Sequence, residues 1–309
     1  MAASTSLPGF KDHLINILKL GDMSEDHINY FLTEQTVKRF QEEVYTHKTF
    51  DARVNYEQME TLGDSNVNEF MPYYIRWRWS FIKSPKWFTR IKHNLVSGKM
   101  LAVIARKMGI EKFIRMGEDL PLKKNAPRTF KKKEALYLLE TKKLEEVWKH
   151  PSVFSYLSIL EDVLEAFCGF LVCLFEEKGY SHGVGVQAVH NILRSLFNAE
   201  KISIDYKDVF DAVTRLKELY EAKALGYRWP FNQTYNIIKD DTTGAEVWTI
   251  QVYGWPLGDR SVKPANRVIL AVATGLDKDR VKEEASGLAL AKLEKDYSIK
   301  EKISDPREY

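Results

Sequence analysis

The sequence contains very little cysteine. Only two of its 309 residues are cysteines, Cys168 and Cys173, and they lie five positions apart in one apolar stretch. Two thiols at that spacing on one helix are poorly placed to form a disulfide, and they match no zinc-ligand pattern. The sequence therefore predicts reduced, buried thiols. It also predicts an intracellular, reducing compartment (cytoplasm or nucleus), and an organelle is compatible as well.

Long apolar runs are also missing. The longest, "FCGFLVCLF" at residues 167–175, has nine residues, whereas a membrane-spanning helix needs about 20. The N-terminal "MAASTSLPGF" has no basic start followed by an apolar run, so we expect no secretory signal and no membrane partner. The hydrophobic fraction of 44% and charged fraction of 29% are typical of a folded protein rather than a disordered one.

Charge is distributed unevenly along the chain. Residues 76–116 carry eleven Lys and Arg against one acid, and residues 121–150 carry nine against four. Because the net charge is only +3, the rest of the chain is acidic by about twelve charges. Such segregation favours a polyanionic partner, and nucleic acid and a merely solvated basic face both remain open.

The first two thirds of the chain has a helical pattern. Apolar residues recur every three or four positions in residues 26–47, 95–110, 156–179 and 185–197. Gly109 and Gly179 stand where helix ends favour glycine. Residues 117–135 carry two prolines and a basic cluster, which predicts a connection between helices.

From about residue 203 the pattern changes. A charged helix is predicted over residues 206–225, followed by β-like runs at 234–239, 246–254 and 267–275. An amphipathic helix at residues 279–295 closes the series. The order α-β-β-β-α predicts a small α+β domain after a mainly α domain.

The stretch "YEQMETLGDSNVNEF", residues 56–70, raises an electrostatic question. Its apolar residues have helical spacing, and Glu57, Glu60 and Asp64 lie three and four residues apart, which places them on one helix face. Like charges at this spacing repel and weaken a helix. The face therefore needs either open solvent or a positive charge over it.

A second acidic pair, Asp162 and Glu165, is spaced i, i+3 in "ILEDVLEAFCG" at residues 159–169. Two helices that bring such acids together form a carboxylate cluster, which persists only with raised pKa values or bound cations. Carboxylate ligands without His or Cys suit Mg²⁺ or Mn²⁺. Paired ions of this kind activate water and stabilise the leaving oxygen in phosphodiester hydrolysis.

A solvated acidic face remains the alternative interpretation, and Glu57 and Glu161 are expected at the surface. Two observations favour a cluster. Asp162 and Glu165 lie within one turn of the most apolar stretch of the chain. Gly63, which costs a helix about 1 kcal/mol relative to Ala, precedes an acid and is consistent with the close approach of another element.

These motifs resemble those of the ribonuclease III family. "YEQMETLGDS" (56–65) is similar to the first family signature and "LEDVLEAFCGFLV" (160–172) to the second. "LVSGKMLAVIARKMGIEKFIRMGEDL" (95–120) resembles the element between them, and the C-terminal α-β-β-β-α order resembles a double-stranded RNA-binding domain. The resemblance implies a mainly α ribonuclease III-type endonuclease domain and a small α+β dsRNA-binding-like domain. The predicted bounds are 1–200 with a basic insertion at about 117–158, then 203–299, then a tail at 300–309.

The resemblance also implies the chemistry. It implies a homodimeric, Mg²⁺-dependent endoribonuclease, with Mn²⁺ as a substitute, that hydrolyses double-stranded RNA to 5′-phosphate products with short 3′ overhangs. The residues that match the family's catalytic and metal-binding acids are Glu60, Asp64, Asp162 and Glu165, whereas Glu57 matches an acid of less central role. Tyr56, Met59 and Leu62 are candidates for the dimer contact, and an ordinary place in the core is the open alternative.

The sequence departs from the family pattern in places. Pro72 interrupts the first signature helix, which is therefore expected to end or kink near Met71. The insertion 117–158 either adds RNA contacts or is a solvated loop. The final helix keeps only Lys278, Arg280 and Lys282 as phosphate contacts, the loop "DDTTGAE" lacks the usual minor-groove residues, and residues 255–267 look inserted. The last domain either binds duplex RNA or serves dimer or partner contacts.

Two other functions are compatible with the resemblance. One is a catalytically silent RNA-binding scaffold of a ribosomal or RNA-editing complex, and the other is a suppressor that sequesters double-stranded RNA. Scaffold members of the family typically lose one or more of the four acids. All four are present in this chain, which favours the enzyme.

Overall fold

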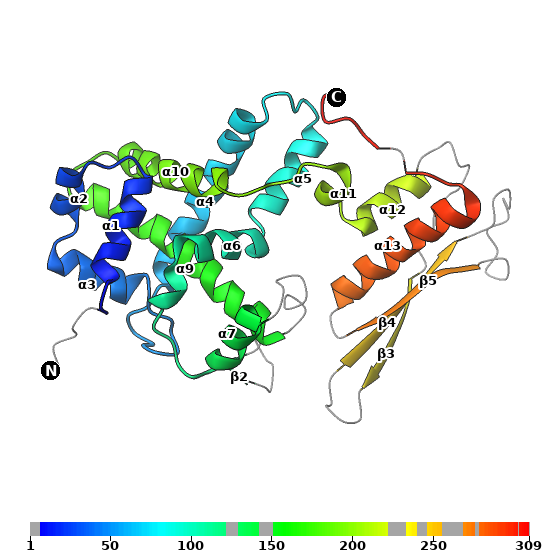
Figure 1. The fold of residues 1–309 in the computed structure, drawn as a ribbon, viewed down its shortest axis with the longest axis horizontal. Coiled ribbons are helices and arrows are strands. Elements are labelled where there is room, and N and C mark those ends of the chain that lie inside the picture. The colour runs from blue at the N-terminus through cyan, green and yellow to red at the C-terminus, as the bar shows by residue number, and fades with distance from the viewer. Residues whose placement is uncertain are drawn as a thin grey trace. The chain divides into compact units, whose positions relative to one another are not determined.

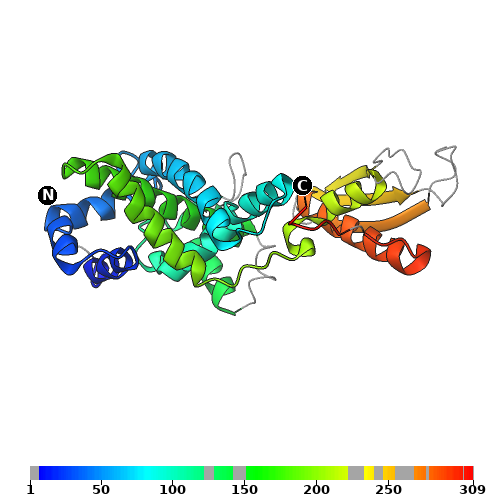
Figure 2. The ribbon, with the colours of Figure 1, turned by 90° about the horizontal axis from the view of Figure 1, so that it is seen from above.

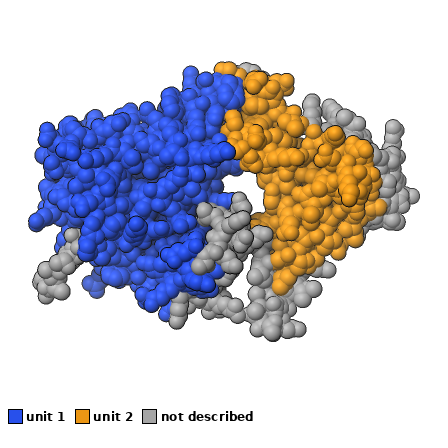
Figure 3. Space-filling view, in the orientation of Figure 1, with its two compact units in different colours: residues 1–82, 91–202 blue, residues 83–90, 203–309 orange. Residues whose placement is uncertain are grey.

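The chain divides into two compact units in a computed structural model (Figures 1 and 3). The helical unit comprises residues 1–82 and 91–202, and the mixed unit comprises residues 83–90 and 203–309. The residues described are 7–121, 129–141, 151–221, 233–239, 246–254, 268–275, 278–301 and 303–308. Among these, no helix is both long and apolar enough to cross a membrane.

Short caps set the ends of the helices in the helical unit. The segment 26–47, predicted to be helical, is two helices, because the Thr33 side chain accepts a hydrogen bond from the Thr36 backbone N–H at 3.2 Å and starts a new helix. Gly109 ends another helix with φ of 77°, as its position in the sequence predicts. The elements of this unit are α1 (Phe10–Leu20), α2 (Glu25–Phe31), α3 (Glu34–Glu43), α4 (Glu57–Arg78), α5 (Pro85–Leu95, whose first residues belong to the mixed unit), α6 (Gly98–Met108), a 3-10 turn (Ile110–Lys112), β1 (Asp119–Pro121), β2 (Thr129–Lys131), α7 (Lys132–Thr141), α9 (Pro151–Glu177) and α10 (His182–Asn198).

Helix α9 forms the centre of the helical unit, with α4, α6 and α10 packed against it (Figures 1 and 2). It is apolar on nearly every side, as a helix surrounded by others must be. Its residues Phe167 and Phe170 are 1% exposed. Cys168 is a buried free thiol and Cys173 a half-buried one.

Of the two outcomes expected near Met71, an end or a kink of the helix, the end is wrong, because α4 continues through Pro72 to Arg78. Its contacts beyond the proline explain this continuity. Ile75 is fully buried, and the Arg78 guanidinium donates a hydrogen bond to the Phe197 carbonyl oxygen of α10 at 2.9 Å. Tertiary packing thus outweighs the local cost of a helical proline.

The segment predicted as a connection at 117–135 contains regular structure. Strands β1 and β2 pair antiparallel, with Leu120 opposite Phe130, and α7 follows them directly. Leu120 and Ala135 are fully buried, and α9 already starts at Pro151, so the predicted insertion 117–158 is in part core structure. Most of its basic residues lie outside the described part of the chain.

The mixed unit has the α-β-β-β-α order predicted from the sequence. Three antiparallel strands pair in the order β3-β4-β5, α13 packs on β4 and β5, and α12 packs on α13 (Figure 1). Its core includes the fully buried Leu216, Ile250 and Ala285. The elements are α11 (Tyr206–Val209), α12 (Ala212–Glu221), β3 (Gln233–Lys239), β4 (Glu246–Gly254), β5 (Val268–Gly275) and α13 (Lys278–Tyr297).

Residues 83–90 belong to this unit although they lie far from it in the sequence. Trp87 is 2% exposed, its ring packs edge-on against Phe210 at 5.1 Å, and its Nε1 donates to Ser304 Oγ at 3.0 Å. The backbone N–H groups of Lys83 and Ser84 both donate to the Pro306 carbonyl oxygen. The mixed unit is therefore built from two separate stretches of sequence.

Candidate metal centre

Helices α4 and α9 approach most closely at a pair of glycines. A Cβ atom on Gly63 would lie 1.7 Å from the Glu165 carbonyl oxygen, and one on Gly169 would lie 2.3 Å from the Met59 carbonyl oxygen. Real Cβ contacts are essentially never shorter than 3.0 Å. Only glycine fits at both positions, which confirms the close approach that Gly63 predicts in the sequence.

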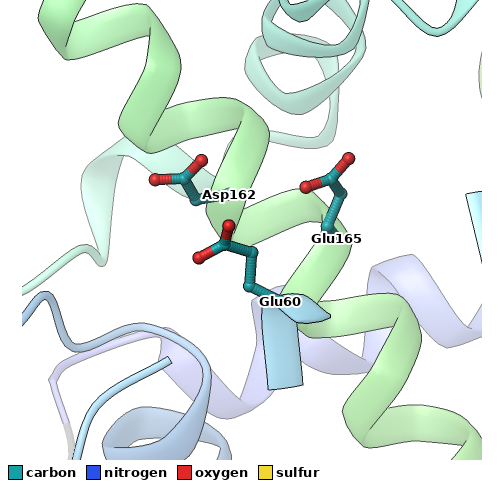
Figure 4. A group of neighbouring side chains, drawn as sticks. All are labelled: Glu60, Asp162 and Glu165. Atoms are coloured by element: carbon teal, nitrogen blue, oxygen red, sulfur yellow. The ribbon is translucent and has the colours of Figure 1, made fainter. Parts of the chain in front are cut away.

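This crossing brings carboxylates of the two helices together (Figure 4). Oxygen atoms of Glu60 from α4 and of Asp162 and Glu165 from α9 all lie within 4.8 Å of one another. Glu165 is 7% exposed, and among the described residues it has neither a hydrogen-bond donor nor a cation as partner. A buried carboxylate without such a partner is costly unless it binds a proton or a metal ion.

Asp64 lies outside that three-carboxylate cluster. It is exposed, one turn after Glu60 on α4, and its carboxylate accepts a hydrogen bond from Asn68 Nδ2 at 2.8 Å. Its charge is nevertheless among those that raise the pKa of Glu60 and Glu165. The structure therefore places three of the four predicted acids in contact and the fourth at the edge of the cluster.

Burial and mutual repulsion raise the pKa values of the clustered acids. The pKa of Glu165 rises to about 9, first because of burial and then because of the charges of neighbouring acids. Burial, followed by the charge of Asp162, raises the pKa of Glu60 to about 7. Burial raises the pKa of Asp162 to about 6, against a hydrogen bond from Tyr56 that lowers it. Such carboxylates hold protons that a divalent cation would displace.

A tyrosine orients one of these acids. The Tyr56 hydroxyl, on a side chain that is 2% exposed, donates to Asp162 Oδ2 at 2.9 Å. This leaves the other oxygen of Asp162 for the cluster. The contact joins two residues 106 positions apart, so sequence spacing gave no sign of it. Of the residues considered for a dimer contact, Tyr56 is thus internal, Met59 is half-buried and Leu62 is exposed.

Two further acids flank the cluster, and they differ in their surroundings. Glu57 is exposed and forms an ion pair with Lys48, as its expected surface position predicts. Glu161, also expected at the surface, is half-buried, and burial together with the charges of Glu60 and Asp64 raises its pKa to about 7. The expectation for Glu161 is wrong. Its i, i+4 spacing to Glu165 places it on the same helix face and was the available signal.

The donor set suits a hard divalent ion. All the candidate ligands are carboxylate oxygens, and they come from two helices held rigidly by the glycine contact. Carboxylate oxygens are the ligands that Mg²⁺ and Mn²⁺ take in proteins. The residues therefore fit the metal that the sequence predicts.

The residues predicted to contact RNA lie in the first two turns of α13. The Lys278 ammonium lies 5.1 Å from the centre of the Trp248 ring, and Arg280 and Lys282 are half-buried. The loop before β4 and the residues 255–267, which look inserted, lie outside the described part of the chain. The role of these three residues stays a prediction.

Comparison with known proteins gives consistent matches. The family model described as "Ribonuclease III domain" matches residues 57–174, a range that holds all four predicted acids. A protein of Frog virus 3 whose name assigns it as a ribonuclease 3 is 31% identical over 85% of this chain and 58% of its own length. One of Invertebrate iridescent virus 6 with the same name is 25% identical over 96% of this chain and 91% of its own length.

Solved structures are more distant. A nuclease domain of ribonuclease III from Campylobacter jejuni is 20% identical, with 60% of this chain and 96% of that one covered and a TM-score of 0.37. Of the Frog virus 3 relative, this chain spans just over half the length.

Proposed function

Because the chain belongs to the ribonuclease III family, we propose that it is an endoribonuclease that hydrolyses double-stranded RNA with Mg²⁺, or with Mn²⁺ as a substitute. The products would carry 5′-phosphates and short 3′ overhangs. In this proposal the ribonuclease domain spans 1–200, and Glu60, Asp64, Asp162 and Glu165 are its metal-binding and catalytic acids.

One observation supports the proposal most directly. Three carboxylates from two helices lie within 4.8 Å of one another, around a buried Glu165 that has neither a cation nor a hydrogen-bond donor as partner among the described residues. A scaffold protein has no need to maintain so unfavourable a cluster, since removing one acid would relieve the repulsion. In an enzyme the cluster is a metal site, and bound cations compensate the repulsion among its carboxylates.

The chain's own residues would position the reaction. Hydrolysis forms a bond between a water oxygen and phosphorus and breaks the bond from phosphorus to the 3′ oxygen, which leaves a 5′-phosphate and a 3′-hydroxyl. Divalent ions supply an activated water and stabilise the leaving oxygen when bound. Tyr56 fixes the orientation of Asp162, and Asp64 at the exposed edge of the cluster would complete the set of acids on the side open to solvent.

A homodimer is part of the same proposal. Exposed apolar side chains follow α4, the helix that carries the first acids, at Leu62, Tyr73 and Trp77. A row of exposed aromatic side chains on one element is characteristic of an interface. Multi-angle light scattering of the purified chain should give twice the monomer mass, and Trp77→Ala should shift it toward the monomer.

We also propose that the mixed unit binds duplex RNA through Lys278, Arg280 and Lys282. Three cations near the start of a helix fit phosphate contacts, which position the protein on a duplex without reading its sequence. Replacing Arg280 and Lys282 by Ala should weaken duplex binding uniformly across sequences and reduce its salt dependence.

The deciding experiment incubates purified protein with long double-stranded RNA, with Mg²⁺ and with a chelator. We expect cleavage only with the metal, and we expect its loss in Glu165→Gln, with Glu57→Gln as the matched control that keeps it. Duplex binding without cleavage at any Mg²⁺ or Mn²⁺ concentration would instead support a silent scaffold or an RNA-sequestering protein. Cleavage undiminished by Glu165→Gln would exclude this metal centre.

A further inference from the structure

Glu161 has an unusual position beside the three-carboxylate cluster. It lies on α9, immediately before Asp162 and four residues before Glu165, and its side chain reaches α6. A Cβ atom built on Gly98, the first residue of α6, would lie 2.2 Å from Glu161 Oε2 and 3.0 Å from Oε1. The carboxylate therefore occupies the space in which any other residue at position 98 would place its side chain.

No positive charge in the described part of the chain compensates the Glu161 carboxylate. Among the described residues Glu161 makes no hydrogen bond and no ion pair, although it is half-buried. The charges that act on it are those of Glu60 and Asp64 on α4, and both are negative. Glu57, by contrast, is exposed and is paired with Lys48.

A structural role does not explain this arrangement. A carboxylate that only packed against α6 could be replaced by an uncharged side chain at no loss, because its charge is repelled by every neighbour that acts on it. The charge has a use if a cation binds between Glu161 and the acids of α4. The acid of α4 that could share such a cation with Glu161 is Asp64, because Asp64 lies outside the three-carboxylate cluster and its charge acts on Glu161.

We infer that Glu161 is a fifth carboxylate of the metal centre: together with Asp64 it binds a divalent cation on the side of the cluster that faces α6, and Gly98 is required to leave room for it. The inference rests on the proposed function, since it extends the same centre. It assigns Glu161 to the metal and Glu57 to the surface, although both acids lie within three residues of a predicted ligand.

The test measures metal binding by the full-length protein without RNA. Metal-free protein is titrated with Mn²⁺ by calorimetry, and free Mn²⁺ is followed in parallel by electron paramagnetic resonance. Glu161→Gln keeps the size of the side chain and removes its charge. We expect it to lower Mn²⁺ affinity by about 10-fold or more, or to remove part of the bound metal, whereas Glu57→Gln should stay within about twofold of wild type.

Thermal unfolding separates this role from a packing role. Metal-free Glu161→Gln should melt no lower than wild type, because a repulsive charge has been removed, but it should gain less from added Mn²⁺. Gly98→Ala, which pushes the carboxylate from its place, should show the same weakened binding. A lower melting temperature of metal-free Glu161→Gln, with an unchanged gain from Mn²⁺, would assign Glu161 to packing and overturn the inference.

The outcomes also separate the inference from the proposed function. If Glu161→Gln binds Mn²⁺ like wild type while Glu165→Gln loses binding and cleavage, the inference fails and the ribonuclease stands. If wild type binds no Mn²⁺ and cleaves no duplex RNA, both fail. Weakened binding in Glu161→Gln and in Gly98→Ala, but not in Glu57→Gln, supports the fifth carboxylate.

Discussion

Replacing Gly63 by Ala should damage the metal centre more than the fold. The new methyl group would lie 1.7 Å from the Glu165 carbonyl oxygen, about 1.3 Å inside the 3.0 Å that real Cβ contacts keep. That oxygen belongs to a helix backbone and cannot rotate away as a side chain can. Helices α4 and α9 must therefore move apart by about 1 Å or more at their crossing.

The energetic consequence can be bounded. Overpacking of this kind costs about 1–3 kcal/mol, and the better helix propensity of Ala returns up to about 1 kcal/mol. We expect a net loss of about 1–2 kcal/mol, equivalent to a melting temperature lower by a few degrees. The protein should remain folded at 25 °C, but with Glu60 displaced from Asp162 and Glu165. A displacement of about 1 Å at a reacting centre is enough to cost about 100-fold in rate.

Three measurements on the same preparation test this prediction. Circular dichroism gives the melting temperature, calorimetry the Mn²⁺ affinity, and cleavage of long duplex RNA the activity. Gly183→Ala is the matched control, because Gly183 lies in helix α10, no atom lies within 4 Å of its added Cβ, and its φ is ordinary. It should leave the Mn²⁺ affinity and the activity unchanged, and it should not lower the melting temperature, because Ala favours a helix over Gly. Wild-type Mn²⁺ affinity in Gly63→Ala would refute the reasoning, since the helices would then not be in contact at this point.

Three further predictions concern pH, the tyrosine and the mixed unit. The pKa of Glu165 is raised from 4.5 to about 9 in the fold, so its contribution to stability is complete below pH 4.5 and is lost as the pH rises toward 9. The melting temperature measured in chelator should therefore fall over this range, and it should fall less in Glu165→Gln. Mn²⁺ should bind more tightly as the pH rises. Tyr56→Phe removes the hydroxyl that donates to Asp162. It should lower the Mn²⁺ affinity measured by calorimetry up to about 10-fold and change the free energy of unfolding by about 1 kcal/mol. An unchanged affinity would show that Asp162 is oriented without the tyrosine hydroxyl. In the ion pair between Arg215 and both carboxylate oxygens of Glu301, the two side chains are only 13% and 16% exposed. Glu301→Gln breaks this pair and should lower the free energy of unfolding, measured by chemical denaturation, by about 1–3 kcal/mol. Glu25→Gln, in the exposed pair with Lys19, should cost nothing measurable.

Periodicity predicted the elements well where the pattern is local. The run 246–254 is the strand β4 with the same bounds, and the mainly α unit followed by an α-β-β-β-α unit is confirmed. The errors have local and tertiary causes. A single threonine cap divides the predicted helix at Thr33, and packing on α9 and α10 carries α4 past Pro72.

Only part of the candidate metal centre could be predicted from the sequence, because the rest of it depends on tertiary contacts. Helical spacing places Asp162 and Glu165 on one face, and Gly63 signals a close approach, but neither says which helix approaches or how deeply. The burial of Glu161 depends on Gly98 of a third helix, and the orientation of Asp162 depends on a hydroxyl 106 residues away. Pair spacing cannot carry such information because both contacts form only in the assembled fold.

The construction of the mixed unit from two separate stretches of sequence has a consequence for synthesis of the chain on the ribosome. Trp87 and Ser304 are 217 residues apart, which at about 5–20 residues per second means roughly 10–40 s between the appearance of the two. During that interval the indole of Trp87 lacks its hydrogen-bond acceptor, and until Phe210 has been added it also lacks the aromatic ring that packs against it. The first stretch emerges early and the second one late, so the mixed unit can complete its folding only after Pro306 has been added. Nascent chains arrested before Phe210 should show an exposed tryptophan at position 87, readable by its fluorescence.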